Sequence, residues 1–186
     1  MEQVFLSLGS NLGDRLANLR QAIRSISELA EITALSHAYE TEPVDVTAQP
    51  WFLNAVLALR IDDVFPEGDV LRPQDASSGA PQQLLERLLA IEHAMGRQRL
   101  SPASIPKGPR LIDLDIVLYG NRVIHQPALS IPHPAMHQRR FVLEPLAEIA
   151  PEVQHPVLHQ SSLQLLRALP EAGPAVKSFA PLNLFP

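Results

Sequence analysis

Cysteine is absent from this chain of 186 residues. Disulfides and thiolate metal sites are therefore excluded, and this absence is typical of proteins that work in a reducing cytoplasm. No apolar stretch approaches the roughly 20 residues needed to cross a bilayer. The start of the chain also lacks the basic segment of a targeting sequence. We therefore expect a soluble cytoplasmic protein with no membrane partner.

An excess of positive charge is also missing, because the formal net charge is -5. A protein that binds nucleic acid through the phosphate backbone normally carries a basic surface, so we expect no nucleic-acid partner. Basic residues gather instead in two local clusters, one of Arg97, Arg99, Lys107 and Arg110, the other of His133, His137, Arg139 and Arg140. Either cluster could meet a compact polyphosphate, or could be a set of solvated loop charges.

Two familiar nucleotide-binding patterns are missing as well. The chain has neither a P-loop nor the glycine-rich loop of protein kinases. Its histidines show no local ligand pattern, so a catalytic metal held by them is a poor hypothesis. If the chain binds a nucleotide, it must use other residues.

The length suits one compact domain with its own core. We expect a single domain over 1–170, interrupted by a mobile insertion at about 62–81, and a proline-rich C-terminal tail over 171–186. Strands are predicted at 4–8, 32–39, 52–61 and around Asp113, with helices over about 16–26 and 81–95. The third strand should lie mid-sheet, antiparallel to the second. A further short strand is expected at 122–124 and a short helix at 141–148. This order favours an α+β fold with a ferredoxin-like core and an antiparallel sheet.

Two aspartates stand in one short strand that is otherwise apolar, directly after a Gly108-Pro109-Arg110 turn. Strand side chains alternate between faces, so Asp113 and Asp115 point the same way and Leu114 points to the opposite face. Such a pair needs a counter-charge, and divalent cations or Arg110 would supply it. A simpler alternative is that the aspartates protect an edge strand from aggregation.

At this point the sequence resembles the 6-hydroxymethyl-7,8-dihydropterin pyrophosphokinase family of folate biosynthesis. The strongest element is the stretch GPRLIDLDIV at 108–117. Supporting segments occur in the same order as in the family, namely LGSNLG at 8–13, YETEPV at 39–44, FLNA at 52–55, EHAMGR at 92–97 and IPHP at 131–134. The match runs from about residue 6 to residue 151.

The resemblance implies an αβα sandwich and a monomeric transferase that moves the pyrophosphoryl group of ATP onto the hydroxymethyl oxygen of the pterin, releasing AMP. It implies two Mg²⁺ ions held by Asp113 and Asp115, with Arg97 and Arg110 as catalytic residues. Pterin contacts would come from Thr41, Val44, Phe52, Asn54 and Phe141. ATP contacts would come from Glu92, Arg99, Arg110, Ile116, His133 and Arg139.

Two other functions remain open from the residues alone. A ferredoxin-like module could bind nucleotide without turnover, since that fold has many functions. An ordinary kinase would cleave at the γ-phosphate and release ADP. The joint presence of Asp113, Asp115, Arg97 and Arg110 argues against a simple binding module, which has little use for a metal clamp.

Overall fold

The computed structural model of the chain describes residues 1–44, 46–62, 79–97 and 108–183. The predicted insertion therefore lies almost wholly outside the described residues, as do Arg99 and Lys107. In chain order the elements are β1 (Glu2–Ser10), α1 (Arg15–Ser27), β2 (Glu31–Leu35), β3 (Ala38–Thr41), β4 (Phe52–Ile61), α2 (Ala80–Ala94), β5 (Asp113–Tyr119), β6 (Ile124–His125), β7 (Ser130–Ile131), a 3₁₀ turn η1 (Met136–Gln138), α3 (Arg140–Ile149), α4 (Ser162–Ala168) and β8 (Val176–Ala180).

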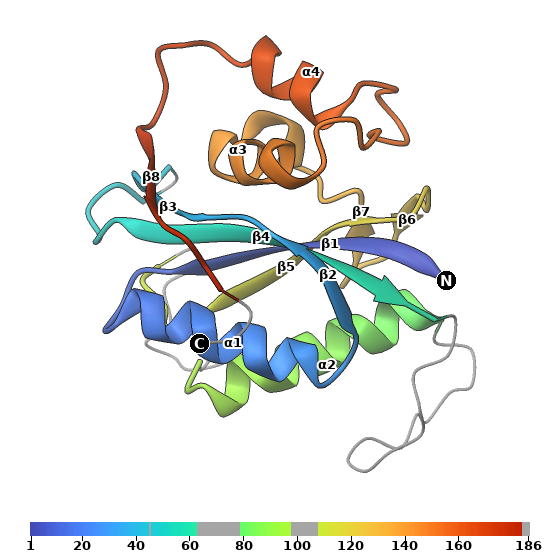
Figure 1. Cartoon of the computed structure of the whole chain (residues 1–186), viewed down its shortest axis with the longest axis horizontal. Helices are drawn as coiled ribbons and strands as arrows, with labels where there is room; N and C mark the ends of the chain where they lie inside the picture. Colours follow the sequence, from blue (N-terminus) through green and yellow to red (C-terminus); the bar gives the residue numbers. More distant parts are fainter. Residues whose placement is uncertain (45, 63–78, 98–107, 184–186) are drawn as a thin grey trace.

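One antiparallel sheet runs through the middle of the molecule (Figure 1). Its strands follow the order β5-β1-β4-β3-β8, and β2 also pairs with β4. The long strand β4 lies in the interior of the sheet and is antiparallel to β2, which confirms both predictions. Strands β1, β3, β4 and β5 are connected through helices α1 and α2, and their spatial order β5-β1-β4-β3 is that of the predicted ferredoxin-like core.

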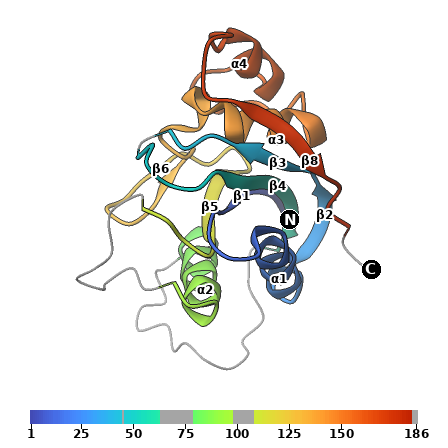
Figure 2. The same cartoon turned by 90° about the vertical axis from the view of Figure 1, so that its left-hand side faces the viewer.

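Helices cover both faces of the sheet. Helices α1 and α2 lie against one face, while α3 and α4 lie over the other (Figures 1 and 2). Alternation along the strands fills two separate cores. The α1–α2 side buries Leu6, Leu8, Leu19, Ile23, Leu84 and Leu88, whereas the α3–α4 side buries Phe5, Val56, Val117, Val142 and Leu146. The α+β sandwich is confirmed, and no helix within the described residues has both the length and the apolarity of a membrane span.

The two long helices begin and end at residues that favour those positions. Asp14 caps α1, because its carboxylate accepts a hydrogen bond from the backbone N–H of Ala17 at 3.0 Å. Helix α2 ends at Ala94, and Gly96 follows with a φ of +94°, a conformation that glycine adopts without strain. The predicted end of this helix at Gly96 is confirmed.

The prediction of one continuous strand at 32–39 is wrong, because the structure has two strands there, β2 and β3. The break lies at Ser36, whose backbone N–H donates to the Val56 carbonyl at 3.0 Å. Its hydroxyl accepts from the backbone N–H of Val56, also at 3.0 Å. The serine side chain therefore replaces one backbone acceptor of the ladder, and the register changes at this point.

Residues 171–186, predicted as a tail, contribute the edge strand β8. This strand pairs with β3 from Ala38 opposite Ala180 to Thr41 opposite Val176. The pairing continues outward, since the Glu42 N–H donates to the Ala175 carbonyl at 3.0 Å. The C-terminal segment therefore braces the chain directly beside Thr41. The division into one domain and a tail stays a prediction.

Candidate active site

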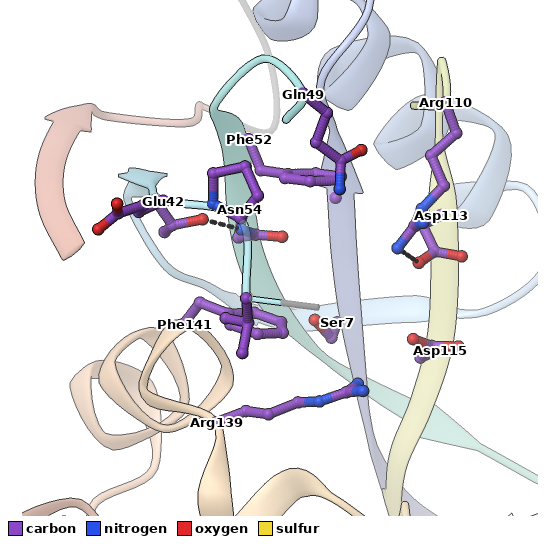
Figure 3. A pocket seen from close by; sticks show the side chains of 14 residues that line it. Ser7, Glu42, Gln49, Phe52, Asn54, Arg110, Asp113, Asp115, Arg139 and Phe141 are labelled. Atoms are coloured by element: carbon purple, nitrogen blue, oxygen red, sulfur yellow. Dashed lines mark hydrogen bonds and ion pairs between the residues drawn. The ribbon is translucent and has the colours of Figure 1, made fainter. Parts of the chain in front are cut away.

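A pocket opens on the α3 side of the sheet, next to the core under that helix (Figure 3). Its floor is the end of β1, where Ser7 and Gly9 follow the buried Phe5 on the same face. The lining residues come from five separate parts of the chain: Ser7, Gly9, Thr41, Glu42, Pro43, Val44, Gln49, Phe52, Asn54, Arg110, Asp113, Asp115, Arg139 and Phe141. Nine of the residues proposed from the sequence are among them.

Asp113 and Asp115 face this pocket from β5. Leu114 between them is buried in the core on the opposite face, as the alternation predicted. Each aspartate is paired with a floor residue of β1, Asp113 with Gly9 and Asp115 with Ser7. The two carboxylates therefore line one side of the floor.

Two arginines bracket Asp113. Arg97 contacts its Oδ1, and Nη2 of Arg110 lies 2.6 Å from its Oδ2. The pairs are mostly shielded from water, so the charges interact more strongly than surface pairs do. The structure thus brings together the two arginines and the aspartate that the sequence analysis placed in one site. The Nε of Arg110 is buried and has no acceptor among the described residues, which indicates that this guanidinium has donor capacity in reserve.

Glu92 lies behind the site and is 1% exposed. Its Oε1 accepts from Nη1 of Arg97 at 2.5 Å and from the backbone N–H of Leu114 at 2.8 Å. Glu92 therefore connects both Arg97 and the first residues of β5 to helix α2. A direct contact between Glu92 and ATP stays a prediction, and the geometry makes it a positioning residue for Arg97.

Asp115 has a pKa raised to about 6. The largest cause is burial, followed by the negative charge of Asp113, while Arg139 and Arg110 act in the opposite direction. At neutral pH this carboxylate is mostly ionised in a place that disfavours its charge. A cation in front of it would relieve that cost.

This raised pKa predicts a pH-dependent stability difference between the wild type and Asp115→Asn. The folded state binds the Asp115 proton more tightly than the unfolded state, so stability is lost as the pH rises from about 4 to about 6. The asparagine variant lacks this loss. In metal-free buffer, its unfolding free energy should match the wild type below pH 4 and exceed it by about 2–3 kcal/mol above pH 7. Urea unfolding at each pH measures the difference, and a constant offset would contradict the assignment.

On the opposite side of the floor, Asn54 is held in one orientation. Its Nδ2 donates to the hydroxyl of Thr41 at 2.5 Å, which leaves Oδ1 above Gly9 as an acceptor. A Cβ atom on Gly9 would lie only 2.7 Å from that Oδ1. The amide can therefore lie across β1 only because residue 9 has no side chain.

Phe52 and Phe141 flank this amide from different elements (Figure 3). Arg110 lies over the Phe52 ring at 5.2 Å and Arg139 over the Phe141 ring at 5.5 Å, measured from the guanidinium carbon to the ring centroid. These cation–π contacts connect the aromatic side of the pocket to its charged side. Two aromatic rings beside a fixed amide are surroundings that suit a flat heteroaromatic ligand with an amide-like edge.

Asn11 joins three segments that the site uses, and the sequence analysis gave it no role. It is 2% exposed. Its Oδ1 accepts from the backbone N–H of Arg110 at 2.7 Å, and its Nδ2 donates to Oε1 of Gln49 and to the Pro50 carbonyl, both at 3.1 Å. Its place between Ser10 and the turn at Gly13 was the available signal, but its partners lie 38 or more residues away.

His133 is neutral near pH 7. Burial, with help from Arg139, lowers its pKa to about 4. Its Nδ1 accepts from the backbone N–H of Ala135 at 3.2 Å, so Nε2 carries the proton and can donate. This tautomer suits a phosphate or hydroxyl acceptor. The ATP role of His133 stays a prediction.

For two other residues predicted to contact ATP, the described part of the structure shows no side chain at the pocket. The side chain of Ile116 is buried in the core on the α1–α2 side, so any contact with ATP would have to use its backbone. Arg99 lies outside the described residues. Among the residues predicted for the other substrate, Val44 is 47% exposed at the rim of the pocket.

The carboxylates fit a hard cation but do not enclose one. Within the described ranges, no group of three or more histidine, aspartate or glutamate residues could hold a metal ion. Mg²⁺ prefers oxygen ligands and is commonly bound by one or two carboxylates plus phosphate oxygens and water. Asp113 and Asp115 supply such oxygens, and the raised pKa of Asp115 shows a charge in need of a partner. The site therefore suits Mg²⁺ that arrives with a phosphorylated ligand.

Known proteins resemble this chain in sequence and in fold. Residues 5–151 match the model of the 7,8-dihydro-6-hydroxymethylpterin-pyrophosphokinase (HPPK) family. The chain is 36% identical to the 2-amino-4-hydroxy-6-hydroxymethyldihydropteridine pyrophosphokinase of Aquifex aeolicus over 84% of this chain and 86% of that protein. The Bacillus subtilis protein of that name is 38% identical over 81% of this chain and 79% of its own length.

Longer proteins match as well. The folic acid synthesis protein fol1 of Schizosaccharomyces pombe is 37% identical over 91% of this chain, but the chain spans only 21% of that protein. The Plasmodium falciparum HPPK-DHPS structure with pterin and p-hydroxybenzoate superimposes with a TM-score of 0.63 at 16% identity, over 89% of this chain and 41% of that one, and shows the shared fold. Since the family match includes both carboxylates, both bracketing arginines and the Asn54 side of the pocket, the chain belongs to the 7,8-dihydro-6-hydroxymethylpterin-pyrophosphokinase family.

Proposed function

We propose that the chain transfers pyrophosphate from ATP to the hydroxymethyl group of 6-hydroxymethyl-7,8-dihydropterin, giving the pterin diphosphate and AMP. The observation that carries this proposal is the division of one pocket into two sides. Asp113 and Asp115 lie on one side with their arginines, and Asn54 lies on the other between two phenylalanine rings. Such a pocket suits one polyanion and one flat polar heterocycle.

On the phosphate side, we propose that Arg97 and Arg110 stabilise the charge of the group being transferred. Both guanidiniums now contact Asp113. Guanidinium groups bind phosphate oxygens with fork-shaped geometry, so a triphosphate next to Asp113 could share these donors. Arg139 and His133 would contact the triphosphate or adenosine from the other side, and Arg99 would add a further contact. Glu92 would act on the nucleotide through Arg97, which it holds in place.

On the pterin side, the held amide of Asn54 would read the polar edge of the ring system. Its Oδ1 is the acceptor that Thr41 leaves available, and it suits an N–H donor of the pterin. Phe52 and Phe141 would stack on the two ring faces. Thr41 and Val44 would add backbone contacts at the rim.

Asp113 and Asp115 would hold two Mg²⁺ ions. When bound, these ions would neutralise charge on the triphosphate and orient its oxygens. The chain's own contribution is to hold the phosphate and alcohol groups in line and to keep water out, since positioning supplies much of the catalysis in such transfers. Once a cation lies beside the Asp115 carboxylate, the pKa of this group would fall from its raised value toward the normal range.

The products of the reaction test this function. Purified protein is incubated with MgATP and the dihydropterin, and the nucleotides and pterins are separated by chromatography. We expect AMP and pterin diphosphate in equal amounts. ADP would indicate an ordinary kinase, and the absence of turnover with intact nucleotide binding would indicate a binding module.

Gly9→Ala should weaken pterin binding selectively. The new Cβ would meet Oδ1 of Asn54 at 2.7 Å, so the amide must move and lose its bond to Thr41. Loss of one well-placed hydrogen bond predicts at least a roughly tenfold lower pterin affinity. Isothermal titration should show this loss while the affinity for MgATP stays unchanged.

Gly79→Ala provides the matched control, because its Cβ would meet only Pro81 Cδ at an ordinary 3.7 Å. The control should bind both ligands as the wild type does. Equal pterin affinity in Gly9→Ala and the control would contradict the proposed place of Asn54.

We also propose that residues 1–170 form a single domain followed by the segment 171–186, and that the protein acts as a cytoplasmic monomer on these two small molecules, without a nucleic-acid or membrane partner. The two substrates would fit within one pocket of one chain, which supports the monomer. Light scattering at working concentrations tests it.

A further inference from the structure

The hydroxyl of Ser7 is a polar group in the floor of the pocket that the roles above do not use. Its residue is 8% exposed, and its neighbours Leu6 and Leu8 are buried in the core on the opposite face. Figure 3 shows its side chain at the pocket, between Phe141 and Asp115. Within the part of the chain that the structure describes, this hydroxyl makes no hydrogen bond.

Because Ser7 lines the pocket, its hydroxyl faces the space that a ligand would fill, and a ligand that displaces water from this hydroxyl must replace the hydrogen bond that the water made. The neighbouring position on this face of β1 is Phe5, which packs in the α3-side core. An apolar side chain at position 7 would extend that core. The position and orientation of Ser7 therefore indicate a partner that a ligand supplies.

The register of the sheet gives the place of that partner. Gly9 is paired with Asn54 of β4 on one side and with Asp113 of β5 on the other. Asn54 and Asp113 are thus separated by two strand spacings, roughly 10 Å. A pterin held by Asn54 must lie across β1 over Gly9, with its 6-substituent directed toward β5.

Ser7 occupies the next floor position on the same face. It is paired with Asp115 on β5, and side chains in such pairs lie about 5 Å apart. A hydroxymethyl group directed toward the aspartates therefore passes beside the Ser7 hydroxyl. A neutral hydroxyl can hydrogen-bond an alcohol without taking the place of either carboxylate.

We propose that Ser7 is a substrate-positioning residue, whose hydroxyl hydrogen-bonds the hydroxymethyl oxygen of the pterin and directs it toward the phosphate side. This inference rests on the proposed function. Ser7 accepts the hydrogen of the alcohol, so that a lone pair of the alcohol oxygen points at the triphosphate. Removal of the Ser7 hydroxyl should therefore affect ligands that carry the alcohol and leave other pterins unaffected.

A double-mutant cycle between protein and ligand tests this. The affinities of 6-hydroxymethylpterin and 6-methylpterin, which lacks only the hydroxyl, are measured by titration for the wild type and Ser7→Ala, with Mg²⁺ and a non-hydrolysable ATP analogue present. The wild type should prefer the hydroxymethyl compound by about five- to tenfold. Ser7→Ala should lose this preference and bind 6-methylpterin as the wild type does.

Two variants serve as controls. Ser7→Thr keeps a hydroxyl at the same position and should retain part of the preference. Ser10→Ala removes a hydroxyl from the opposite face of the same strand, where Ser10 accepts a hydrogen bond from Asn18, and should keep the full preference. In turnover assays, Ser7→Ala should lower kcat more than it raises KM for the pterin, because a misdirected alcohol binds but reacts slowly.

Each outcome decides between distinct conclusions. An unchanged preference for the hydroxymethyl compound in Ser7→Ala overturns the role of Ser7. If Ser7→Ala loses affinity only for the ATP analogue, this role is also overturned, and the hydroxyl would serve Asp115 instead. If the wild type binds neither pterin, the proposed function fails, and the role of Ser7 that rests on it is overturned as well. A wild type that binds both pterins equally overturns the role of Ser7 and leaves the proposed function intact.

Discussion

Replacing Asp115 with asparagine is expected to lower turnover by about a thousandfold or more while it stabilises the folded protein. The variant removes a carboxylate oxygen and the negative charge that would hold Mg²⁺ against the triphosphate, and such charge stabilisation is often the largest single contribution to catalysis. It also removes a carboxylate whose pKa burial raises to about 6. Steady-state assays of AMP release and thermal unfolding without metal measure the two effects.

Asp113→Asn makes the comparison sharper. Its activity loss should be similar, but its stability should fall, because Arg97 and Arg110 both contact the Asp113 carboxylate and would lose their shared partner. Asp62→Asn, at an exposed position after β4, should change neither property. Retained turnover in either site variant would refute the metal role of the pair. If Asp113→Asn and Asp115→Asn changed the stability in the same direction, the proposed difference between the surroundings of the two aspartates would be refuted.

Alternation along the strands made the carboxylate side of the site predictable from sequence. With a period of two, Asp113-Leu114-Asp115 must place both carboxylates on one face, and the structure confirms that Leu114 lies in the opposite core. The same alternation in β1 could have revealed the floor, because Val4, Leu6 and Leu8 alternate with Phe5, Ser7 and Gly9. A face that changes from aromatic to small side chains at the end of a buried strand indicates room for a ligand.

Features that depend on distant pairing were not predictable in this way. The roles of Ser7 and Gly9 follow from the register of β1 with both neighbours, which joins segments about 50 and 100 residues apart in sequence. Strand β8 was missed because it is short and mostly exposed, with prolines close by. The break at Ser36 was missed because a serine side chain there substitutes for a backbone group, which no periodicity records.

Asn11→Ala is expected to reduce both stability and turnover, because this side chain connects the two sides of the pocket. The Asn11 Oδ1 holds the backbone of Arg110, and its Nδ2 holds Gln49 and Pro50 just before Phe52. The variant leaves the Arg110 N–H and the Pro50 carbonyl without these partners in a partly buried place. We expect a loss of about 1–3 kcal/mol in unfolding free energy, because water can replace part of the bonding that these partly buried groups lose.

The effect on turnover should exceed what the lost stability explains. At a temperature where the variant remains folded, Arg110 would no longer be held at its place beside Asp113, and a small displacement of a catalytic group can lower kcat about a hundredfold. Asn18→Ala is the matched control. Asn18 braces the same turn through Ser10 and the Leu12 carbonyl but touches neither Arg110 nor the segment before Phe52. It should therefore lose stability with near-normal kcat. Equal kcat values in the folded Asn11→Ala and Asn18→Ala proteins would show that Asn11 only stabilises the fold, whereas a selective loss in Asn11→Ala would show that one buried amide sets the geometry between the phosphate side and the pterin side.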